Sequence, residues 1–508
     1  MKLKTFMGVS AGFHDAGVSV INGNGDILFA GHSERYSKVK NDATLNEGIM
    51  SAALEYGDPD VIAWYERPWL KKTRQLYSGE WRKAFLELSP RKQLTPYFDN
   101  MLLSSPGVDS RPTRTIQYHS HHLSHAAAGF QTSPFDRAIV VVVDAIGEWD
   151  TYSVYEARYE PICGFAQYKP LMRQRYPHSL GLFYSAMTQR AGLKPMEEEY
   201  ILMGMAAYGT PQFYRDMYDE CVDKDHAYKW KRNFHTGVED NFLEGATNED
   251  IATATQMITE RAMETLMRRI SDDYPHIDDC VFMGGVALNC VANSRIRDHW
   301  NRLWIMPNPG DCGSSLGAAA LSYGKKLNWK GPYLGTDIPG KYPCANIVSE
   351  LINNKIVGVA SGRAEFGPRA LGNRSLLADP RGHDIKDMVN NIKRRQKFRP
   401  FAPMVLKEFA KDHFDMPQFD ESPYMQFTYK CTSPQEYPAI THADRTSRVQ
   451  TVSKHDKTGA RELLEMWYTA TGCPMLLNTS LNIRGEPMVN DRTDADRFEK
   501  KYGVTVCS

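Results

Sequence analysis

Long apolar runs are missing from this 508-residue sequence. No stretch approaches the roughly 20 apolar residues that span a bilayer, and His14 and Asp15 interrupt the N-terminal apolar run too soon for a signal peptide. The formal net charge is zero, with 61 basic and 61 acidic residues, so no global field attracts nucleic acid or an anionic membrane. We therefore expect a cytoplasmic protein without a membrane partner, whose basic sites are local.

Paired cysteine motifs and low-complexity segments are also missing. The nine cysteines are an odd number, are scattered and form no C-x-x-C pair, which favours reduced core thiols over disulfides or a zinc–thiolate site. The apolar content of 42% and charged content of 24% are typical of a globular chain. The length favours two or three domains.

Two β-rich segments share one pattern. Residues 6–34 read as strand, turn, strand, turn and strand, and residues 137–157 begin again with an apolar run, a glycine-containing turn and a second strand. This recurrence indicates an internal repeat, and residues 252–270 have helical periodicity. We expect two similar α/β lobes facing a cleft. The Gly- and Pro-rich segment near residues 328–343 reads as a linker to a second domain, which opens with a helix and a strand.

The segment YHSHHLSHAAAGF contains the sharpest candidate metal motif. His121 and His125 lie four residues apart and would share one helix face, where two imidazoles can bind one metal. Asp144 and Asp311 each follow a strand-like run in a glycine-containing turn, where a carboxylate would be exposed at a cleft. Mixed N/O ligation fits iron(II), manganese or zinc. A chance histidine-rich turn and turn-capping aspartates are the alternatives.

His14 lies in the first turn beside Asp15. There an imidazole could reach the cleft and take a proton from an attacking hydroxyl. The alternative is a turn histidine that is simply bonded to Asp15.

The second domain contains a dense group of basic residues. The segments GRAEFGPRALGNRSLLADPR and KRRQKFRPFAPMVL hold nine Arg and Lys residues against two carboxylates, Glu365 and Asp379. Aromatic and aliphatic residues interleave the charges, which favours a half-buried anion pocket over a solvated face. Ser480 and Asn482 follow an apolar strand and are placed to complete that pocket.

Ten motifs in order give the sequence a family resemblance. They are GFHDAGVSVI, HHLSHA, VVVDAIGEW, LMGMAAYG, GGVALNC, PGDCGSSLGAA, GRAEFGPRALGNRS, FRPFAPMVL, RVQTV and LLNTSLNIRGEP. Together they resemble the O-carbamoyltransferases that modify nodulation factors and antibiotics of the tobramycin, cephamycin and novobiocin type. The match spans nearly the whole chain.

The resemblance implies a fold and a reaction. It implies an α/β protein with a duplicated actin- and sugar-kinase-like (ASKHA) domain over residues 1–335 and a YrdC-like domain over residues 344–508. In such enzymes the second domain joins carbamoyl phosphate and ATP into carbamoyl-adenylate and releases pyrophosphate. The first domain then transfers the carbamoyl group to a hydroxyl, at a metal for which Fe(II) is the leading expectation.

The resemblance also implies roles for individual residues. The expected metal ligands are His121, His125, Asp144 and Asp311, and the expected base is His14. The nucleotide would be lined by Gly284, Gly285 and Asn289. The carbamoyl phosphate and ATP site would be formed by Lys397, Arg399, Arg448, Ser480 and Asn482. The chain departs from its relatives at Ile201, where a cleft lysine is usual, at Ala145 and at Arg445.

The acceptor is less well specified. Residues 64–92 and 227–235 mix Lys and Arg with aromatic residues, which suits stacking on bases and contacts with phosphates. An amphipathic surface helix is the alternative. The acceptor is thus a small molecule, a sugar or a hydroxymethylated base in DNA, and a homodimer stays open. A threonylcarbamoyl-type tRNA-modifying enzyme, a sugar-kinase-like phosphotransferase and a non-catalytic nucleic-acid-binding protein are the other functions that the sequence leaves open.

Overall fold

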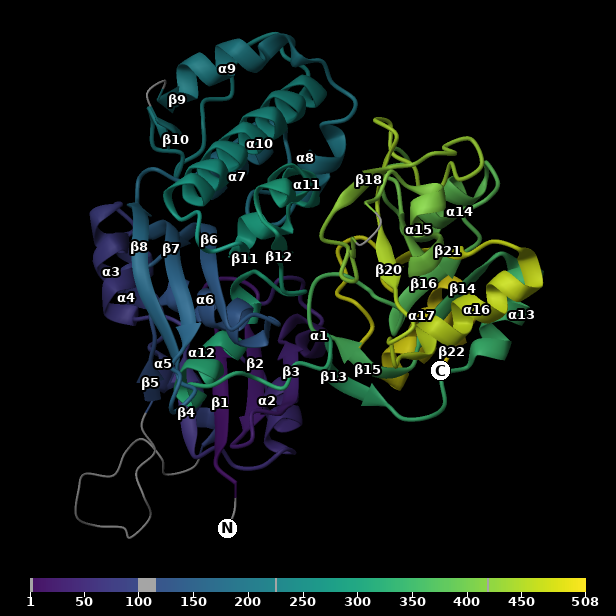
Figure 1. Ribbon diagram of the computed structural model, residues 1–508, viewed down its shortest axis with the longest axis horizontal. Coiled ribbons are helices and arrows are strands. Elements are labelled where there is room, and N and C mark those ends of the chain that lie inside the picture. The colour runs from purple at the N-terminus through teal and green to yellow at the C-terminus, as the bar shows by residue number, and fades with distance from the viewer. Residues whose placement is uncertain (1–2, 99–115, 224–225, 418–419) are drawn as a thin grey trace.

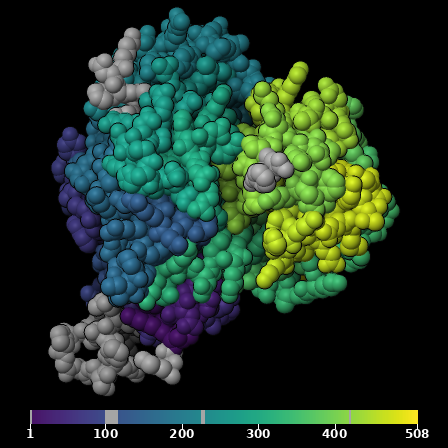
Figure 2. Space-filling model, in the orientation of Figure 1, coloured from purple at the N-terminus to yellow at the C-terminus, as the bar shows by residue number. Residues whose placement is uncertain are grey.

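A computed structural model describes residues 3–98, 116–223, 226–417 and 420–508. Figure 1 shows an N-terminal part, coloured purple to teal, beside a C-terminal part, coloured green to yellow. The two parts are packed against each other (Figure 2). Among the contacts that join them, Tyr208 Oη donates to the carbonyl of Phe398 at 2.9 Å and Ser294 Oγ to that of Thr428 at 3.1 Å.

The N-terminal part is built from two sheets with the same topology. The strands of the first sheet are β1 (Thr5–Ser10), β2 (Gly17–Asn22), β3 (Ile27–His32), β4 (Val61–Trp64) and β5 (Ile116–Tyr118). The strands of the second are β6 (Arg137–Gly147), β7 (Asp150–Tyr159), β8 (Ala166–Arg175), β11 (Asp279–Met283) and β12 (Arg302–Trp304).

In both sheets the spatial order is third, second, first, fourth and fifth strand. The first three strands are antiparallel, and the last two run parallel to the first. The two sheets thus have the same strand order and the same strand directions. This confirms the α/β class, the internal repeat and the expected duplicated ASKHA-type domain.

Two helices lie between these sheets. The helix α12 (Ser314–Tyr323) packs on β1, β2 and β4, and α6 (His121–Thr132) packs on β6, β7 and β11. They approach closely because glycine occupies the contact: a Cβ on Gly317 would lie 1.7 Å from the carbonyl oxygen of Ser124, and one on Gly8 would lie 1.9 Å from that of Ser315. This close approach brings the starts of α6 and α12 together.

Further helices cover the outer faces. In Figure 1, α3 (Pro68–Tyr77) and α4 (Trp81–Leu86) lie beside β8 of the second sheet, where the Tyr77 ring contacts that of Tyr176, and α5 (Pro90–Leu94) lies near β5 of the first. The helices by the second sheet also include α7 (Leu180–Arg190), α8 (Glu199–Met205), α9 (Tyr214–Cys221), α10 (Asn248–Asp273) and α11 (Cys290–Ile296). The helix expected over residues 252–270 is thus confirmed as α10, which begins with a capping box between Thr247 and Asp250. No helix in the described part of the chain combines the length and apolarity needed to cross a membrane.

The C-terminal part is built around a mixed six-stranded sheet in the order β20-β17-β21-β16-β14-β22. Its strands are β14 (Ile356–Ala360), β16 (Arg374–Ala378), β17 (Ala402–Leu406), β20 (Gln450–Val452), β21 (Met475–Ser480) and β22 (Val506–Cys507). Its helices are α13 (Cys344–Asn354), α14 (Ile385–Ile392), α15 (Lys407–His413), α16 (Gly459–Thr471) and α17 (Arg492–Tyr502). The expected opening helix and strand are α13 and β14.

The connection between the parts differs from the expected linker. Residues 328–343 contain β13 (Tyr333–Ile338), which pairs antiparallel with β15 (Gly362–Glu365) and contacts β3. Backbone pairing therefore orders a segment whose glycines and prolines hide any strand periodicity. All nine cysteines are free and Cys163 alone is exposed, which confirms reduced core thiols.

Candidate functional site

Four side chains converge where α6, β6 and the turn before α12 meet. His121, His125, Asp144 and Asp311 each offer one ligand atom, and these atoms lie within 4.8 Å of one another. The two Nε2 atoms are 3.2 Å apart. His121 Nε2 lies 3.2 Å from Asp144 Oδ2 and 3.3 Å from Asp311 Oδ1, and His125 Nε2 lies 3.3 Å and 3.2 Å from the same atoms. The structure therefore brings together all four predicted metal ligands.

A helical spacing, a register shift in a strand and a short turn position these four side chains. His121 and His125 are one helical turn apart on α6, so their rings point the same way. Asp144 lies where the register of β6 against β7 shifts, and Asp311 begins a short turn before α12. We expected both carboxylates after their strands and exposed. That expectation is wrong: Asp144 lies within β6 and is 8% exposed, and Asp311 is 6% exposed.

The outer ring nitrogens of both histidines face oxygen atoms. His125 Nδ1 lies 3.0 Å from the carbonyl oxygen of Pro309, so Nδ1–H donates and Nε2 is left free as an acceptor. His121 Nδ1 lies 3.8 Å from Glu66 Oε2 and has no hydrogen-bond partner among the described residues. Glu66 in turn accepts from Lys71 Nζ at 2.9 Å, and both of these side chains are buried.

The histidines and aspartates of the cluster shift the pKa values of one another. Burial lowers the pKa of His121, but Asp311 and Asp144 outweigh it and raise that pKa well above its ordinary value. Burial raises the pKa of Asp144, but the two histidines hold it well below its ordinary value. The neighbouring His122 behaves differently, because burial and the charge of His121 hold its pKa well below its ordinary value. His122 Nδ1 instead bonds Ser153 Oγ at 2.8 Å, as a structural neighbour.

His14 faces the same region. Its Nδ1 lies 3.3 Å from Asp15 Oδ2. Burial lowers the pKa of His14, but Asp15, Asp311 and Asp144 raise it to about 9. The expected base and the alternative of a turn histidine bonded to Asp15 are therefore compatible, because the ring makes that bond and still lines the central cavity.

One cavity of about 380 Å³ is lined by both parts of the chain. From the N-terminal part it includes His14, Asp144, Gly285 and Asn289, and from the C-terminal part Arg399, Arg448, Ser480 and Asn482. Residues predicted for the acyl-transfer, nucleotide and carbamoyl phosphate sites thus share one space. The cavity lies where the two parts face each other.

Six cations line the C-terminal side of this cavity: Arg369, Lys393, Arg395, Arg399, Arg448 and Arg484. Burial and the charges of Arg399 and Arg448 lower the pKa of Arg395 to about 8, and burial with Arg448 lowers that of Arg369 to about 9. Arg448 Nε is buried without a hydrogen-bond partner among the described residues. Apart from Arg484, which pairs with Glu198 at 3.1 Å, none of these cations pairs with a carboxylate of the described residues. Such a group of cations could bind an anion.

Lys393 organises the floor of that site. Its Nζ donates to Ser480 Oγ at 3.2 Å and to Asn482 Oδ1 at 2.9 Å, as well as to the carbonyl oxygens of both residues. Sequence reasoning missed Lys393 as a site residue and chose Lys397. Lys397 is exposed and does not line the cavity, because it follows the end of α14 and points outward. The alternation of charged and aromatic residues in this segment gave no signal to separate them.

The other basic residues of the arginine-rich segments are structural. Arg374 is fully buried and donates to the carbonyls of Asn490, Ser361 and Thr336. Arg381 pairs with Asp379 at 2.7 Å. At least these two of the nine basic residues therefore stabilise the fold, and the sequence could not show which ones.

Of the three residues predicted to line the nucleotide, two line the cavity and one does not. Gly285 lines the cavity, and its N–H donates to Asp144 Oδ1 at 3.3 Å. Gly284 does not line it: this residue has φ of 94°, and a Cβ there would lie 2.1 Å from the carbonyl oxygen of Val143. Asn289 caps α11 and also donates to Gln256 Oε1 at 2.9 Å.

The departure at position 201 has a smaller effect than expected. Ile201 is completely buried and does not line the cavity, whereas Glu199 and Tyr200 do. Glu199 accepts from Ser185 Oγ at 2.5 Å, and the Tyr200 ring lies 4.8 Å from the guanidinium of Arg399. The absence of a lysine at this position therefore removes no group from the cavity wall.

Known relatives and structures resemble this chain over most of its length. An uncharacterized protein of Synechocystis sp. is 31% identical over 585 residues, covering 97% of this chain and 93% of the relative. Nodulation protein NolNO of Sinorhizobium fredii is 29% identical, covering 95% and 76%. Nodulation protein U of Rhizobium tropici is 28% identical, covering 95% and 92%. The activator of 2-hydroxyisocaproyl-CoA dehydratase from Clostridium difficile has a TM-score of 0.34 at 13% identity, covering 63% of this chain and 94% of that chain.

Two family models match nearly all of the chain. The carbamoyltransferase N-terminus matches residues 5–320, and the carbamoyltransferase C-terminus matches residues 348–507. Between them they include every residue assigned above to the metal cluster, the base and the cavity. The chain therefore belongs to the carbamoyltransferase family.

Proposed function

We propose that this carbamoyltransferase uses ATP to activate carbamoyl phosphate as carbamoyl-adenylate and then transfers the carbamoyl group to a hydroxyl. The observation that supports this proposal is one cavity that has six cations on one side and, on the other, His14 and Asp144, which is one residue of the four-residue His/Asp cluster. Two half-reactions that share an intermediate need such a common space. We also propose that the chain divides into two domains, residues 1–335 and residues 344–508, and that both line this cavity.

The donor half-reaction would take place at the cations. Water attacks the carbamoyl carbon of carbamoyl phosphate and phosphate leaves. An oxygen of the resulting carbamate then attacks the α-phosphorus of ATP, and pyrophosphate leaves. Arg369, Arg395, Arg399 and Arg448 are placed to stabilise the charge on these phosphates. Lys393 holds Ser480 and Asn482 in position as further hydrogen-bonding groups.

The acyl-transfer half-reaction would take place near His14. The acceptor oxygen attacks the carbamoyl carbon, the bond to AMP breaks, and His14 accepts the proton of the hydroxyl. A neutral imidazole is required for this. Since Asp144 and Asp311 contribute to the raised pKa of His14, a divalent cation held between those carboxylates would lower that pKa toward neutrality.

The donor set fits a divalent metal. The ligand atoms of the cluster are separated by 3.2–3.3 Å in five of their pairings, as expected for atoms about 2.1 Å from one ion. Two imidazoles and two carboxylates suit Fe(II) first, with manganese and zinc as alternatives. Bound there, the metal would supply Lewis-acid stabilisation of the adenylate.

The donor half-reaction tests this proposal without knowledge of the acceptor. The protein is incubated with ATP, carbamoyl phosphate and Fe(II) or Mn(II), and pyrophosphate and carbamoyl-adenylate are measured by enzymatic assay and mass spectrometry. We expect Arg448→Ala to reduce pyrophosphate release at least about 100-fold, since it removes a half-buried cation from the phosphates. Lys397→Ala is the matched control, because this exposed cation lies outside the cavity.

Either of two results would contradict the proposal: no pyrophosphate with any metal, or equal losses in both variants. If pyrophosphate forms, candidate acceptors are screened for the mass gain of one carbamoyl group. They include aminoglycosides, sugars and DNA with hydroxymethylated bases. Phosphorylated product would instead favour a sugar-kinase-like activity, and incorporation of threonine would favour a threonylcarbamoyl enzyme.

A further inference from the structure

Exposed aromatic side chains gather on α3 and α4. Tyr77 is 72% exposed, Trp81 60% and Phe85 73%, and Phe13, in the loop that carries His14, is 43% exposed. Aromatic rings are costly to leave in water, and a contiguous group of them marks a binding surface. We call these four residues, with Lys72 and Arg82, the stacking surface.

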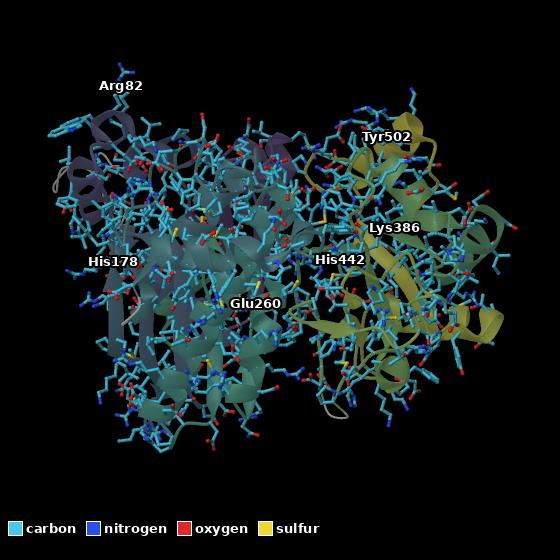
Figure 3. The ribbon with its side chains drawn as sticks, turned by 90° about the horizontal axis from the view of Figure 1, so that it is seen from above. Arg82, His178, Glu260, Lys386, His442 and Tyr502 are labelled. Carbon is cyan, nitrogen blue, oxygen red and sulfur yellow. The ribbon has the colours of Figure 1, made fainter. Side chains whose placement is uncertain are left out.

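The charge of the stacking surface is positive. The three carboxylates of residues 64–92 are used internally: Glu66 and Glu87 by Lys71, and Glu80 by Arg74 and Lys83. Lys72 and Arg82 form no ion pair with any described carboxylate. Figure 3 shows Arg82 projecting from the edge of the molecule. The outward charge of this surface therefore has no internal counter-charge.

Two basic and aromatic segments that are far apart in the sequence meet here. His235 Nε2 lies 3.7 Å from Glu80 Oε2, and the Tyr176 ring contacts both Tyr77 and His235 at centroid distances of 6.3 and 5.6 Å. The Trp149 ring lies 5.4 Å from that of Tyr77. Of the second segment, His235 contacts this surface, whereas Trp230 and Phe234 are buried in the core.

This surface is continuous with the loop of the candidate base. Lys71 Nζ donates to the carbonyl of Gly12 at 3.3 Å and lies 5.8 Å from the centre of the Phe13 ring. The same Nζ contacts Glu87, just beyond α4, at 2.6 Å. A ligand that covers Tyr77 and Phe85 is therefore held beside His14.

We infer that the stacking surface binds a polynucleotide and presents one of its bases, bearing a hydroxymethyl group, to His14. Aromatic rings stack on bases of any sequence and the unpaired cations contact phosphates, and an unpaired or flipped-out base can enter a cavity that a duplex cannot. The inference rests on the proposed function. In the step itself the hydroxymethyl oxygen attacks the carbamoyl carbon, AMP leaves, and His14 takes the proton.

The test measures binding of a fluorescent 20-nucleotide single strand to the full chain by anisotropy over a range of salt concentrations. We expect Lys72→Ala/Arg82→Ala to weaken binding at least about tenfold and to reduce the slope of log affinity against log salt by about 1.4, since each lost phosphate contact contributes roughly 0.7. Tyr77→Ala is expected to weaken binding about tenfold with an unchanged slope. The control is Lys411→Ala/Lys430→Ala/Lys500→Ala, which removes three exposed cations of the C-terminal part, one more than the test variant.

Pyrophosphate release without acceptor is measured in parallel for every variant. Unchanged pyrophosphate release with lost strand binding supports the inference. If the wild type releases pyrophosphate but does not bind the strand, or if the control triple variant loses as much affinity as the test variant, the inference is wrong while the proposed function stands. A dimer in sedimentation that Trp81→Ala/Phe85→Ala dissociates would also overturn it, by showing that a second copy covers this surface. Absent pyrophosphate would instead refute the proposed function.

Discussion

The change Glu66→Gln should weaken metal binding at the four-residue cluster. Glu66 lies behind His121, with Oε2 3.8 Å from Nδ1, and it is the only described group that offers that nitrogen an ion-pair partner. A carboxylate in this position orients a ligating imidazole and raises its basicity. Glutamine keeps the shape of the side chain but removes its charge.

The structure sets the magnitude. Loss of such a supporting group costs about 10- to 100-fold in metal affinity, and the 3.8 Å separation is longer than a hydrogen bond, which places the effect at the lower end. We therefore expect about a tenfold loss, equivalent to about 1.4 kcal/mol. His125 should be unaffected, because its Nδ1 is fixed by the carbonyl of Pro309 at 3.0 Å.

Equilibrium dialysis with Fe(II) or Mn(II), followed by elemental analysis of the protein, measures this affinity directly. Glu87→Gln is the matched control: Glu87 contacts Lys71 at 2.6 Å from the other side but does not contact His121. Unchanged affinity in Glu66→Gln, or an equal loss in Glu87→Gln, would refute the role assigned to Glu66. Urea denaturation of both variants would separate a loss of folding from a loss of binding.

Three further predictions follow from packing and charge. Gly317→Ala places a Cβ 1.7 Å from the Ser124 carbonyl, so we expect it to separate α6 from α12, to cost about 3 kcal/mol in urea denaturation and to weaken metal binding. The bond from the Thr210 N–H is the main cause that lowers the pKa of Asp250 to about 2; Asp250→Asn should therefore cost about 1 kcal/mol at neutral pH. This difference should vanish in denaturation curves as the pH falls from about 4 to about 2, because Asp250 stabilises the fold only while ionised. Pyrophosphate should raise the Tm of the wild type, and of Arg448→Ala by less, since the anion offsets the repulsion among the cavity cations; equal shifts would contradict this.

The sequence was enough to predict the duplicated fold and to identify the four residues of the His/Asp cluster. The helical spacing of His121 and His125 fixes their common direction, and the repeat places α6 after β5 and the turn of Asp311, with α12, after β12. It did not predict that Asp144 and Asp311 are buried. Asp144 is enclosed because a register shift in β6 turns it inward, and such a shift leaves no periodic signal.

For the proposed anion site, the sequence likewise did not show which basic side chains face the cavity. Charge density indicated the segments that line the cavity, but Lys393 and Lys397 lie in one segment, and only the end of α14 decides which of them faces the cavity. Arg374 looks like a ligand-binding residue in the sequence and instead bonds backbone carbonyls in the core. Patterns of residue type identify a site, whereas the direction of each side chain depends on where elements end.

The two sides of the cavity have opposite charge, and the fold keeps them from neutralising each other. Asp144 is engaged by His121, and Glu199 accepts from Ser185, so neither carboxylate pairs with the arginines across the space. The arginines consequently keep their charge available for an anion, even though burial and their mutual repulsion lower the pKa of Arg395. A carbamoyl-adenylate would lie with its phosphate attracted by both the arginines and a cation at the cluster, and with its carbamoyl carbon near His14. Separated charge within one cavity thus provides a physical reason for activation and transfer to use the same space.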